Sequence, residues 1–380
     1  MNLKNGEPRK GIDEPKRIFY VAYFSKERTL GNTLGETWKY PARSLAIPQI
    51  RDDPRVRAEW DKQKDIAFFD LNDLFFDFAR YPSKKILFTH LGGGFGDIIS
   101  FSAIAEYLRK KTIRVFTDEK FFFLFKWFSN QDIRLSPHHA IIAEHFTPGN
   151  RAERFMNFAR LRMEYAAIDG GQRNWYDSMF RRIGIADTPK DYRRPHLVQR
   201  TDSFSNVPKK NSILLVHRSS CQMRSSTLAD FYFPTREAYP DSKIFVHNHD
   251  LTAQDRLFAN QLGDNIKIIP ECTTEAYFDN LFAASMVVST DTSAIHFREG
   301  VQKPCLAVYG AMSMESRTEG YKYTRSFNVK SYCPFQPCFI HELVKDAVCL
   351  NSEEGARTAQ CQSGEGFREQ LLEELKAYKP

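Results

Sequence analysis

The chain has 380 residues, of which 42% are hydrophobic and 27% charged, with a formal net charge of +7. This composition is ordinary for a globular protein, and about 150 residues per domain predicts two domains. No apolar run reaches the ~18 residues of a membrane helix, and the polar N-terminal residues do not resemble a signal peptide, so we expect no transmembrane segment and a cytoplasmic location. Seven cysteines in such a protein argue against a disulfide framework.

Residues 1–82 are expected to form an N-terminal extension. About the first 17 residues look unstructured, whereas Arg17 to Phe24 has strand composition and predicts a hairpin or an edge strand. Residues 25–64 show weak periodicity, and no structure is predicted for them. Ile66 to Tyr81 carries an aromatic stripe that we expect to pack the extension onto the next domain. Its acidic charge opposes binding to anionic lipid.

The stretch from Lys84 to Lys110 begins a different kind of structure. A short apolar strand, Ile86 to Phe88, leads into a glycine-rich turn that contains Gly94 and Gly96. Asp97 then opens a helix whose apolar residues recur every three or four positions. Glycines allow close approach of a ligand, and a helix N-terminus offers N–H groups to an anion, so this unit predicts nucleotide binding. Its glycine spacing is not that of a dinucleotide site, and from this turn alone Asp97 reads as a helix cap.

Strands and helices alternate through most of the remaining chain, which predicts parallel sheets covered on both faces. The aromatic run Phe121 to Phe128 is expected in the core, and residues 131–205 are expected to complete the first domain with helices. Thr201 to Asn211 reads as a linker. The expected strands are TIRVFTD before the linker and SILLVH, KIFVHN, IKII, MVVST and CLAVYG after it, with a final amphipathic helix in GEGFREQLLEELKAY. Ligands bind such sheets at the carboxyl ends of the strands.

A second informative stretch runs from Val287 to Gly310. A buried strand leads into Asp291, Thr292 and Ser293, where small residues at a helix start expose N–H donors suited to a pyrophosphate. His296 lies on the first turn of this helix and could point the same way. The plain alternative is an ordinary helix cap with a partly buried histidine.

Together the two stretches resemble glycosyltransferase family 9, the heptosyltransferases, which have the GT-B fold of two Rossmann-like α/β domains facing a cleft. The resemblance covers about residues 84 to 350, and Ser293 stands where the family has glycine. The matching elements occur in the family's order: Gly96-Asp97, Asp291-Thr292 followed by His296, Lys303-Pro304, and Tyr309-Gly310. The resemblance implies an acceptor-side domain over residues 83–205 and a donor-binding domain over residues 206–380.

The resemblance also implies inverting transfer of a heptose-like or hexose sugar from a nucleotide-diphosphate donor to an acceptor hydroxyl on a surface glycan or protein. Asp97 would be the catalytic base that takes the proton of that hydroxyl. Arg224, or the neighbouring Arg218, would offset charge on the departing diphosphate; a solvent-exposed arginine is the plain alternative. The implied donor-binding residues are Gly94, Gly96, Arg218, Asp291, Thr292, Ser293 and His296.

Four cysteines follow this region with the spacing C-x4-C-x10-C-x11-C: Cys333, Cys338, Cys349 and Cys361. Four thiolates can hold a tetrahedral Zn or Fe ion, which predicts a structural metal site, although reduced thiols in a loop are the alternative. The long extension and these cysteines resemble the autotransporter heptosyltransferase branch, which glycosylates protein and uses such cysteines for iron. The other three, Cys221, Cys272 and Cys305, read as structural.

Two other functions stay open at this point. The Arg-rich stretch from Arg151 to Arg200 and the positive net charge would suit a glycosyltransferase acting on modified DNA. A non-catalytic binding protein with the same fold is the other alternative. The residues do not identify the donor base, the sugar or the acceptor, and a homo-oligomer is left open.

Overall fold

The computed structural model describes part of the chain. The described segments are residues 94–137, 174–182, 187–200, 205–220, 224–330 and 360–378, the single residues 185, 333 and 349, and the backbone of the strands given below that lie outside these ranges. Within these segments no helix combines the length and the apolar character that crossing a membrane requires.

The larger sheet has six strands, all parallel, in the order β12-β11-β10-β13-β14-β15. This is the doubly wound order, in which the first strand, β10, lies between the second, β11, and the fourth, β13. Successive strands are added on one side of β10 as far as β12 and then on its other side from β13, so the switch point lies between β10 and β13. Ligands of such sheets bind at this switch point. The strands are β10 Ser212–Val216, β11 Lys243–His247, β12 Ile266–Ile269, β13 Met286–Thr290, β14 Cys305–Tyr309 and β15 Thr324–Asn328.

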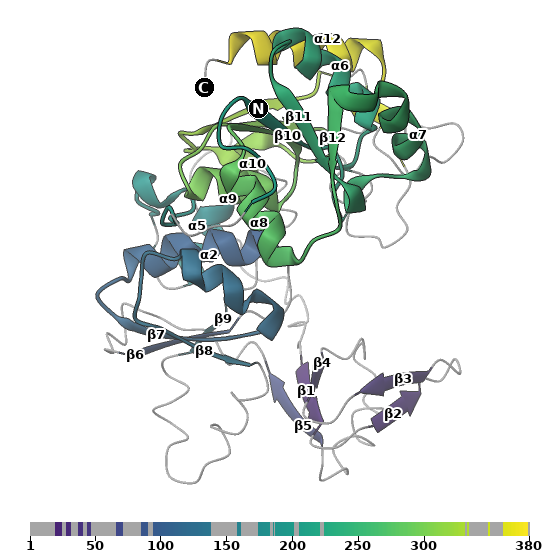
Figure 1. Ribbon diagram of the computed structural model, residues 1–380. Coiled ribbons are helices and arrows are strands. Elements are labelled where there is room, and N and C mark those ends of the chain that lie inside the picture. Colours follow the sequence, from purple (N-terminus) through teal and green to yellow (C-terminus); the bar gives the residue numbers. More distant parts are fainter. Residues whose placement is uncertain are drawn as a thin grey trace, which may run out of the picture.

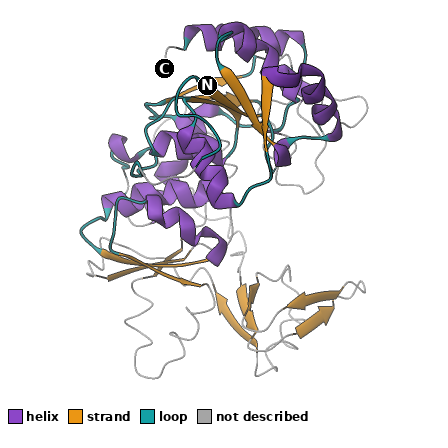
Figure 2. Cartoon of the chain, in the orientation of Figure 1, coloured by secondary structure: helices purple, strands orange, loops and turns teal. Residues whose placement is uncertain are grey.

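Helices cover both faces of this sheet (Figures 1 and 2). They are α6 Leu228–Ala238, α7 Ala253–Leu262, α8 Thr274–Ala283, α9 Ser293–Gly300, α10 Met314–Thr318 and α12 Glu365–Ala377, with short 3-10 turns at Asn248–Asp250, Gly263–Asn265 and Gln360–Gln362. Successive side chains of a strand point to opposite faces. Accordingly Ile213 and Leu215 enter the core under α6 and α12, whereas Leu214 and Val216 enter the core under α8 and α9.

The smaller sheet is also parallel, with the order β8-β7-β6-β9. Its strands are β6 Lys85–Thr89, β7 Thr112–Thr117, β8 Ile133–Pro137 and β9 Phe158–Arg160, and its helical segments are α2 Phe95–Tyr107, the 3-10 segment Glu119–Trp127, α5 Trp175–Arg182 and the 3-10 turn Lys190–Tyr192. The expectation that residues 131–205 complete the first domain with helices is met by α5 and the turn Lys190–Tyr192, but it misses the strands β8 and β9. Residues 133–137 add an edge strand beside β7, because that position completes the hydrogen bonds of β7.

The N-terminal region contains short antiparallel strands. They are β1 Tyr20–Phe24, β2 Arg28–Gly31, β3 Thr37–Tyr40, β4 Ser44–Ala46 and β5 Ile66–Asp70. The strand predicted as a hairpin or an edge is instead the middle strand of β4-β1-β5, and β2 pairs with β3. Residues 25–64, for which nothing was predicted, supply β4 as one partner of β1, and the aromatic stretch that begins at Ile66 supplies the other, β5.

The aromatic run near residue 121 lies in the core, as predicted, and it also joins the two parallel-sheet units. The ring of Trp127 meets the ring of Phe297 in α9 edge to face at 5.0 Å and that of Phe282 in α8 at 5.2 Å. The ring of Phe95 lies 5.6 Å from that of Phe278. Aromatic contacts of this kind bury large areas with defined geometry, so they hold α2 and the segment Glu119–Trp127 against α8 and α9 (Figure 1).

Candidate functional site

The two sequence motifs meet where α2 and α9 begin. A β-carbon at Gly96 would stand 3.1 Å from Cδ2 of His296 and 3.6 Å from Cα of Ser293. Only glycine allows the two helix starts to approach this closely without displacing the histidine ring. Gly96 therefore serves packing between the two units.

Asp97 is the third residue of α2. Its carboxylate accepts the backbone N–H of Gly94, which is the half of a capping box that does not need an N-cap side chain, and its own N–H donates to the carbonyl of Gly94 at 3.1 Å. Burial raises the pKa of Asp97 above its ordinary value, while the Gly94 hydrogen bond and the charges of Arg317 and Arg224 act in the opposite direction. The carboxylate is thus a helix cap and also a stronger base than an exposed aspartate.

Arg224 lies beside Asp291 at the switch point of the larger sheet. Its Nη1 is 3.2 Å from Oδ2 of Asp291, which is only 3% exposed. Burial alone would raise the pKa of Asp291, but the positive charges of Arg224 and Arg317 hold it below its ordinary value. Asp291 therefore stays anionic and forms an ion pair with the partly exposed guanidinium.

The start of α9 has the geometry expected for an anion site. Thr292 is the cap, and its Oγ1 accepts the N–H of Ala294 at 3.2 Å. Among the described residues other than glycine, positive φ occurs only at Asn211 and Gln302, so Ser293 keeps an ordinary backbone in place of the family's glycine. The first N–H groups of the helix face its N-terminal end, as in other anion-binding helices.

His296 is buried and belongs to a chain of hydroxyl groups. Its Nδ1 lies 2.6 Å from Oη of Tyr321, which lies 2.8 Å from Oη of Tyr176. Burial lowers the pKa of His296 to about 4; Asp291 opposes this shift, and the positive charges of Arg317 and Arg224 add to it. The imidazole is therefore neutral at pH 7.

An aromatic ring and a second arginine complete this cluster. The Trp175 ring lies 5.4 Å from the ring of His296, and the guanidinium of Arg317 lies 4.3 Å over the same indole. Trp175 and Arg317, like Tyr176 and Tyr321, were not predicted from the sequence. They come from α5, α10 and the segment after α10, which carry no motif of their own.

Arg218 lies in a different environment from Arg224. Its charge acts on Asp250 and His217, and it is not among the charges that shift Asp97, Asp291 or His296. Burial raises the pKa of Asp250 to about 7, and Arg218 opposes that shift. Of the two predicted arginines, Arg224 is therefore the one that lies with Asp97 and Asp291.

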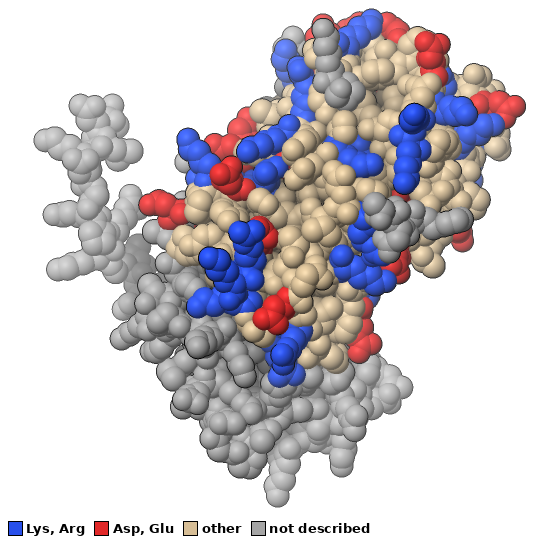
Figure 3. All heavy atoms as spheres, turned by 60° about the vertical axis from the view of Figure 1, so that its left-hand side comes forward, with Lys and Arg blue, Asp and Glu red and all other residues tan. Residues whose placement is uncertain are grey.

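Two arginines of the Arg-rich stretch are engaged within the protein. Arg193 binds both carboxylate oxygens of Asp177 at 3.1 Å, and Arg194 lies 3.7 Å from Glu299. On the face in Figure 3, Lys and Arg side chains form separate groups with acidic side chains and neutral surface between them. Most of residues 151–173 lie outside the described part of the chain.

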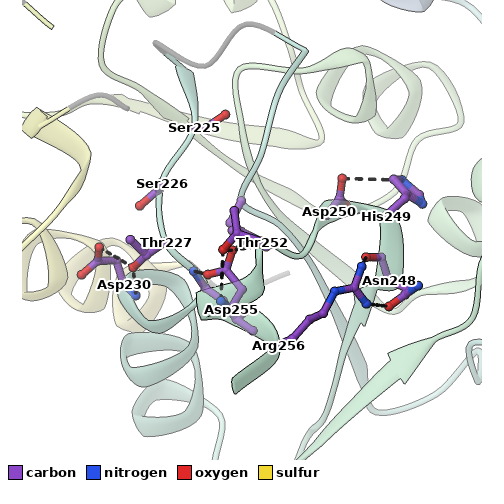
Figure 4. A network of polar contacts seen from close by, with 12 residues as sticks. Ser225, Ser226, Thr227, Asp230, Asn248, His249, Asp250, Thr252, Asp255 and Arg256 are labelled. Carbon is purple, nitrogen blue, oxygen red and sulfur yellow. Dashed lines mark hydrogen bonds and ion pairs between the residues drawn. The ribbon is translucent and has the colours of Figure 1, made fainter. Parts of the chain in front are cut away.

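One group of side chains in the described residues has the spacing of metal ligands: His247, His249 and Asp250, with one ligand atom of each within 4.8 Å of the others. Nε2 of His249 lies 3.5 Å from Oδ1 of Asp250 (Figure 4). The rings of His247 and His249 stack at 5.1 Å. The group lies at the carboxyl end of β11 and was not predicted.

The hydrogen bonds of His247 oppose a metal there. The backbone N–H of Asn206 donates to Oδ1 of Asn280 at 3.0 Å, which directs Nδ2 of Asn280 to Nε2 of His247 at 3.1 Å. Nε2 is therefore the acceptor, and Nδ1 carries the proton of the neutral ring. A metal needs an unprotonated nitrogen, and the one available is already bonded.

The predicted cysteine site is only partly described. Cys338 lies outside the described residues, as does Cys221; Cys349 is buried, and Cys333 and Cys361 are partly buried. A β-carbon at Gly310 would stand 2.9 Å from Sγ of Cys361, so this cysteine lies at the carboxyl end of β14. The neighbouring Gln362 accepts the hydroxyl of Thr290 at 3.0 Å. The four-cysteine metal site stays a prediction.

Comparison with solved structures identifies the architecture. The iron-containing dodecameric glycosyltransferase TibC from enterotoxigenic E. coli matches 77% of this chain and 78% of its own, at TM-score 0.53 and 12% identity. The chain has the GT-B fold. TibC in complex with ADP-D-β-D-heptose matches 96% of both chains at TM-score 0.51 and 12% identity. A family 9 glycosyl transferase from Veillonella parvula matches 78% of this chain and 97% of its own, at TM-score 0.54 and 13% identity.

These likenesses confirm the predicted fold class, α/β with the GT-B architecture of the family 9 heptosyltransferases. At such identities they establish the fold and not the activity. No protein-family model matches the sequence, and no curated protein sequence matches it significantly.

Proposed function

We propose that this chain is an inverting glycosyltransferase that moves a heptose-like sugar from a nucleotide-diphosphate donor to an acceptor hydroxyl. The observation that carries the proposal is the meeting of Asp97, at the start of α2, with the start of α9 and with Arg224. A carboxylate with raised pKa, a guanidinium paired with Asp291 and a helix N-terminus lie near the switch point of a GT-B fold.

In the proposed reaction the acceptor oxygen forms a bond to the anomeric carbon while the bond from that carbon to the diphosphate breaks. The Asp97 carboxylate takes the proton of the acceptor hydroxyl. Arg224 and the first N–H groups of α9 stabilise the charge that develops on the departing diphosphate. Attack from the face opposite the leaving group inverts the anomeric centre.

ADP-heptose is the donor class that we propose. It rests on the likeness to TibC, whose complex holds ADP-D-β-D-heptose. TibC is iron-containing and dodecameric, and by the same analogy we propose a structural metal at the cysteines and a homo-oligomer for this chain. The acceptor is a surface glycan or a protein.

A polynucleotide acceptor is the weaker alternative. Arg193 and Arg194 bind carboxylates of the protein itself, and on the face in Figure 3 the described Lys and Arg side chains lie in separate groups. Steep salt dependence of binding to duplex DNA would support that alternative.

Replacement of Asp97 tests the proposal. The amide oxygen of Asp97→Asn can still accept the Gly94 N–H, so the cap and ADP binding should remain, whereas sugar transfer should fall by about 10²–10⁴-fold. The measurement is ADP release from ADP-D-β-D-heptose in the presence of glycan and protein acceptors. Transfer by Asp97→Asn at the wild-type rate would show that Asp97 is only a cap, and a wild-type protein that turns over no nucleotide sugar would support the non-catalytic alternative.

A further inference from the structure

Gln362, in the 3-10 turn before α12, is fully buried and contacts two segments of the proposed donor site. Its main-chain carbonyl accepts the hydroxyl of Ser226, and its side-chain oxygen lies 3.0 Å from Oγ1 of Thr290. Ser226 lies just after Arg224 in the chain. Thr290 ends β13, directly before Asp291. One residue from the C-terminal part of the chain therefore contacts both segments whose side chains form the Arg224–Asp291 ion pair.

The hydroxyl of Thr290 lies between the turn and the Arg224 segment. Besides the side chain of Gln362, it contacts the main-chain carbonyl of Arg224. Whichever of these two oxygens takes the single hydroxyl proton, the hydroxyl stands between them. The guanidinium of Arg224 meets the next residue, Asp291, with Nη1 3.2 Å from Oδ2. The main chain and the side chain of Arg224 thus contact consecutive residues at the end of β13.

Gly310, directly after β14, leaves the space in which the Gln362 amide lies. A β-carbon at Gly310 would stand 2.5 Å from Nε2 and 3.0 Å from Cγ of Gln362. Any larger residue would therefore displace the amide from the ends of β13 and β14. This gives a structural reason for the glycine of the Tyr309-Gly310 motif.

We infer that Gln362 is a positioning residue that holds the Arg224 segment on the end of β13, so that the guanidinium meets Asp291 and faces the departing diphosphate. The part that concerns the diphosphate rests on the proposed function, whereas the position of Arg224 does not. Gln362 acts through Thr290 and Ser226 and touches no ligand itself. Because these contacts are buried, the loss of one partner leaves the others without compensation from water.

The position of Arg224 can be measured without any ligand. Its side chain is 18% exposed, so an arginine reagent such as phenylglyoxal can reach it. Gln362→Met removes the amide and nearly keeps the side-chain volume. Arg224 should then leave Asp291 more often and react severalfold faster, relative to Arg325 in the same protein, as peptide mass spectrometry reports. An unchanged rate, or an equal rise at Arg325 that shows general loosening, overturns the inference.

Two further variants guard this test. Thr290→Val keeps the shape of the side chain and removes the hydroxyl, so it should also speed the modification of Arg224, and it replaces Gln362→Met if that variant does not fold. Gln370→Met is the matched control. Gln370 is likewise buried and bonded to main-chain groups, at Lys330 and Asn328, so its replacement should leave the Arg224 rate unchanged.

Titration with ADP connects the position of Arg224 to the diphosphate. Gln362→Met should bind ADP about tenfold more weakly, because a displaced guanidinium loses a charge-assisted contact. In an Arg224→Ala background the same substitution should cause no further loss, since two residues that act through one contact are not additive. Wild-type affinity in Gln362→Met, or a full additional loss in the double variant, contradicts action through Arg224 on the diphosphate. A wild-type protein that does not bind ADP contradicts the proposed function, and the modification rates still decide whether Gln362 positions Arg224.

Discussion

At the scale of single residues, the site sets two carboxylates against two guanidiniums. Burial raises the pKa of Asp97, whereas Asp291 is held below its ordinary pKa by Arg224 and Arg317 despite its burial. One carboxylate is thereby suited to take a proton and the other to remain an ion-pair partner. Because both residues are aspartates, the difference in their pKa values follows from their neighbours and their burial.

Arg317 should control the acid limb of the pH–rate profile. Its positive charge lowers the pKa of Asp97 against the dominant effect of burial. Arg317→Gln removes that charge, so the base becomes protonated at higher pH, and the fall in kcat/KM on acidification should begin at higher pH than in the wild type. Rates measured between pH 4 and pH 8 test this, and a limb that stays in place would mean that Arg317 acts only by packing on Trp175.

Arg298 should matter for stability and not for chemistry. It is fully buried and donates to the carbonyls of Leu281 and Ala284 at the end of α8, of Ser285, and of Pro304. Arg298→Met takes the guanidinium donors away from these carbonyls, of which that of Pro304 keeps the backbone N–H of Val287, so the free energy of unfolding should fall by about 3 kcal/mol. Urea unfolding measures it. The control is Arg325→Met, whose partly exposed pair with Glu374 should cost about 1 kcal/mol at most.

At the scale of elements, the contact between α2 and α9 depends on the absence of a side chain at Gly96. In Gly96→Ala the new methyl group should push the His296 ring by a few tenths of an ångström, so the fold should survive while KM for the donor rises severalfold. Steady-state kinetics measure KM for the donor and show whether the variant remains active. Gly366→Ala in α12 is the matched control: its β-carbon meets nothing within 4 Å, so it should leave the kinetics unchanged and stabilise the helix by up to about 1 kcal/mol.

The elements that could be predicted from sequence are those whose residues carry their own signal. The central strands β10, β13 and β14 are continuous apolar runs, and α9 begins at a recognisable cap. In contrast, α6 contains Pro234 in its interior, and β15 has the polar sequence TRSFN, so neither was expected. Their structure is decided by packing against α12 and by pairing with β14.

The same reason decides which residues of the site could be predicted from the sequence. Asp97, Asp291 and His296 lie in motifs, so they could be singled out, although their roles remain proposals. Trp175 and Arg317 could not, because each becomes part of the site only when α5 and α10 pack beside α9. A contact made by tertiary packing between distant segments leaves no periodic pattern in a single sequence.

At the scale of the whole molecule, the cysteines should form a structural metal site that takes no part in transfer. Four thiolates fill a tetrahedral shell and leave no open position for a substrate. Double replacement of Cys338 and Cys349 by Ser should therefore remove the metal and lower the Tm, while ADP binding persists wherever the fold does.

Elemental analysis of untagged protein purified without chelators decides whether the cysteine site exists, and well under one metal per chain contradicts it. Absorbance then separates the two ions, since Fe(III) thiolates are coloured and Zn is colourless. Rapid reaction of all four thiols with a thiol reagent in the native protein would also count against the site.

The close contact between the starts of α2 and α9 also bears on how the two units can move. Gly96 places them against each other, and the rings around Trp127 fill the space behind. A rotation of one unit against the other would therefore pivot near this point. Such a pivot would move the parts of the two units far from it more than it would change the distance from Asp97 to the start of α9, so the proposed base would keep its position relative to the proposed donor site.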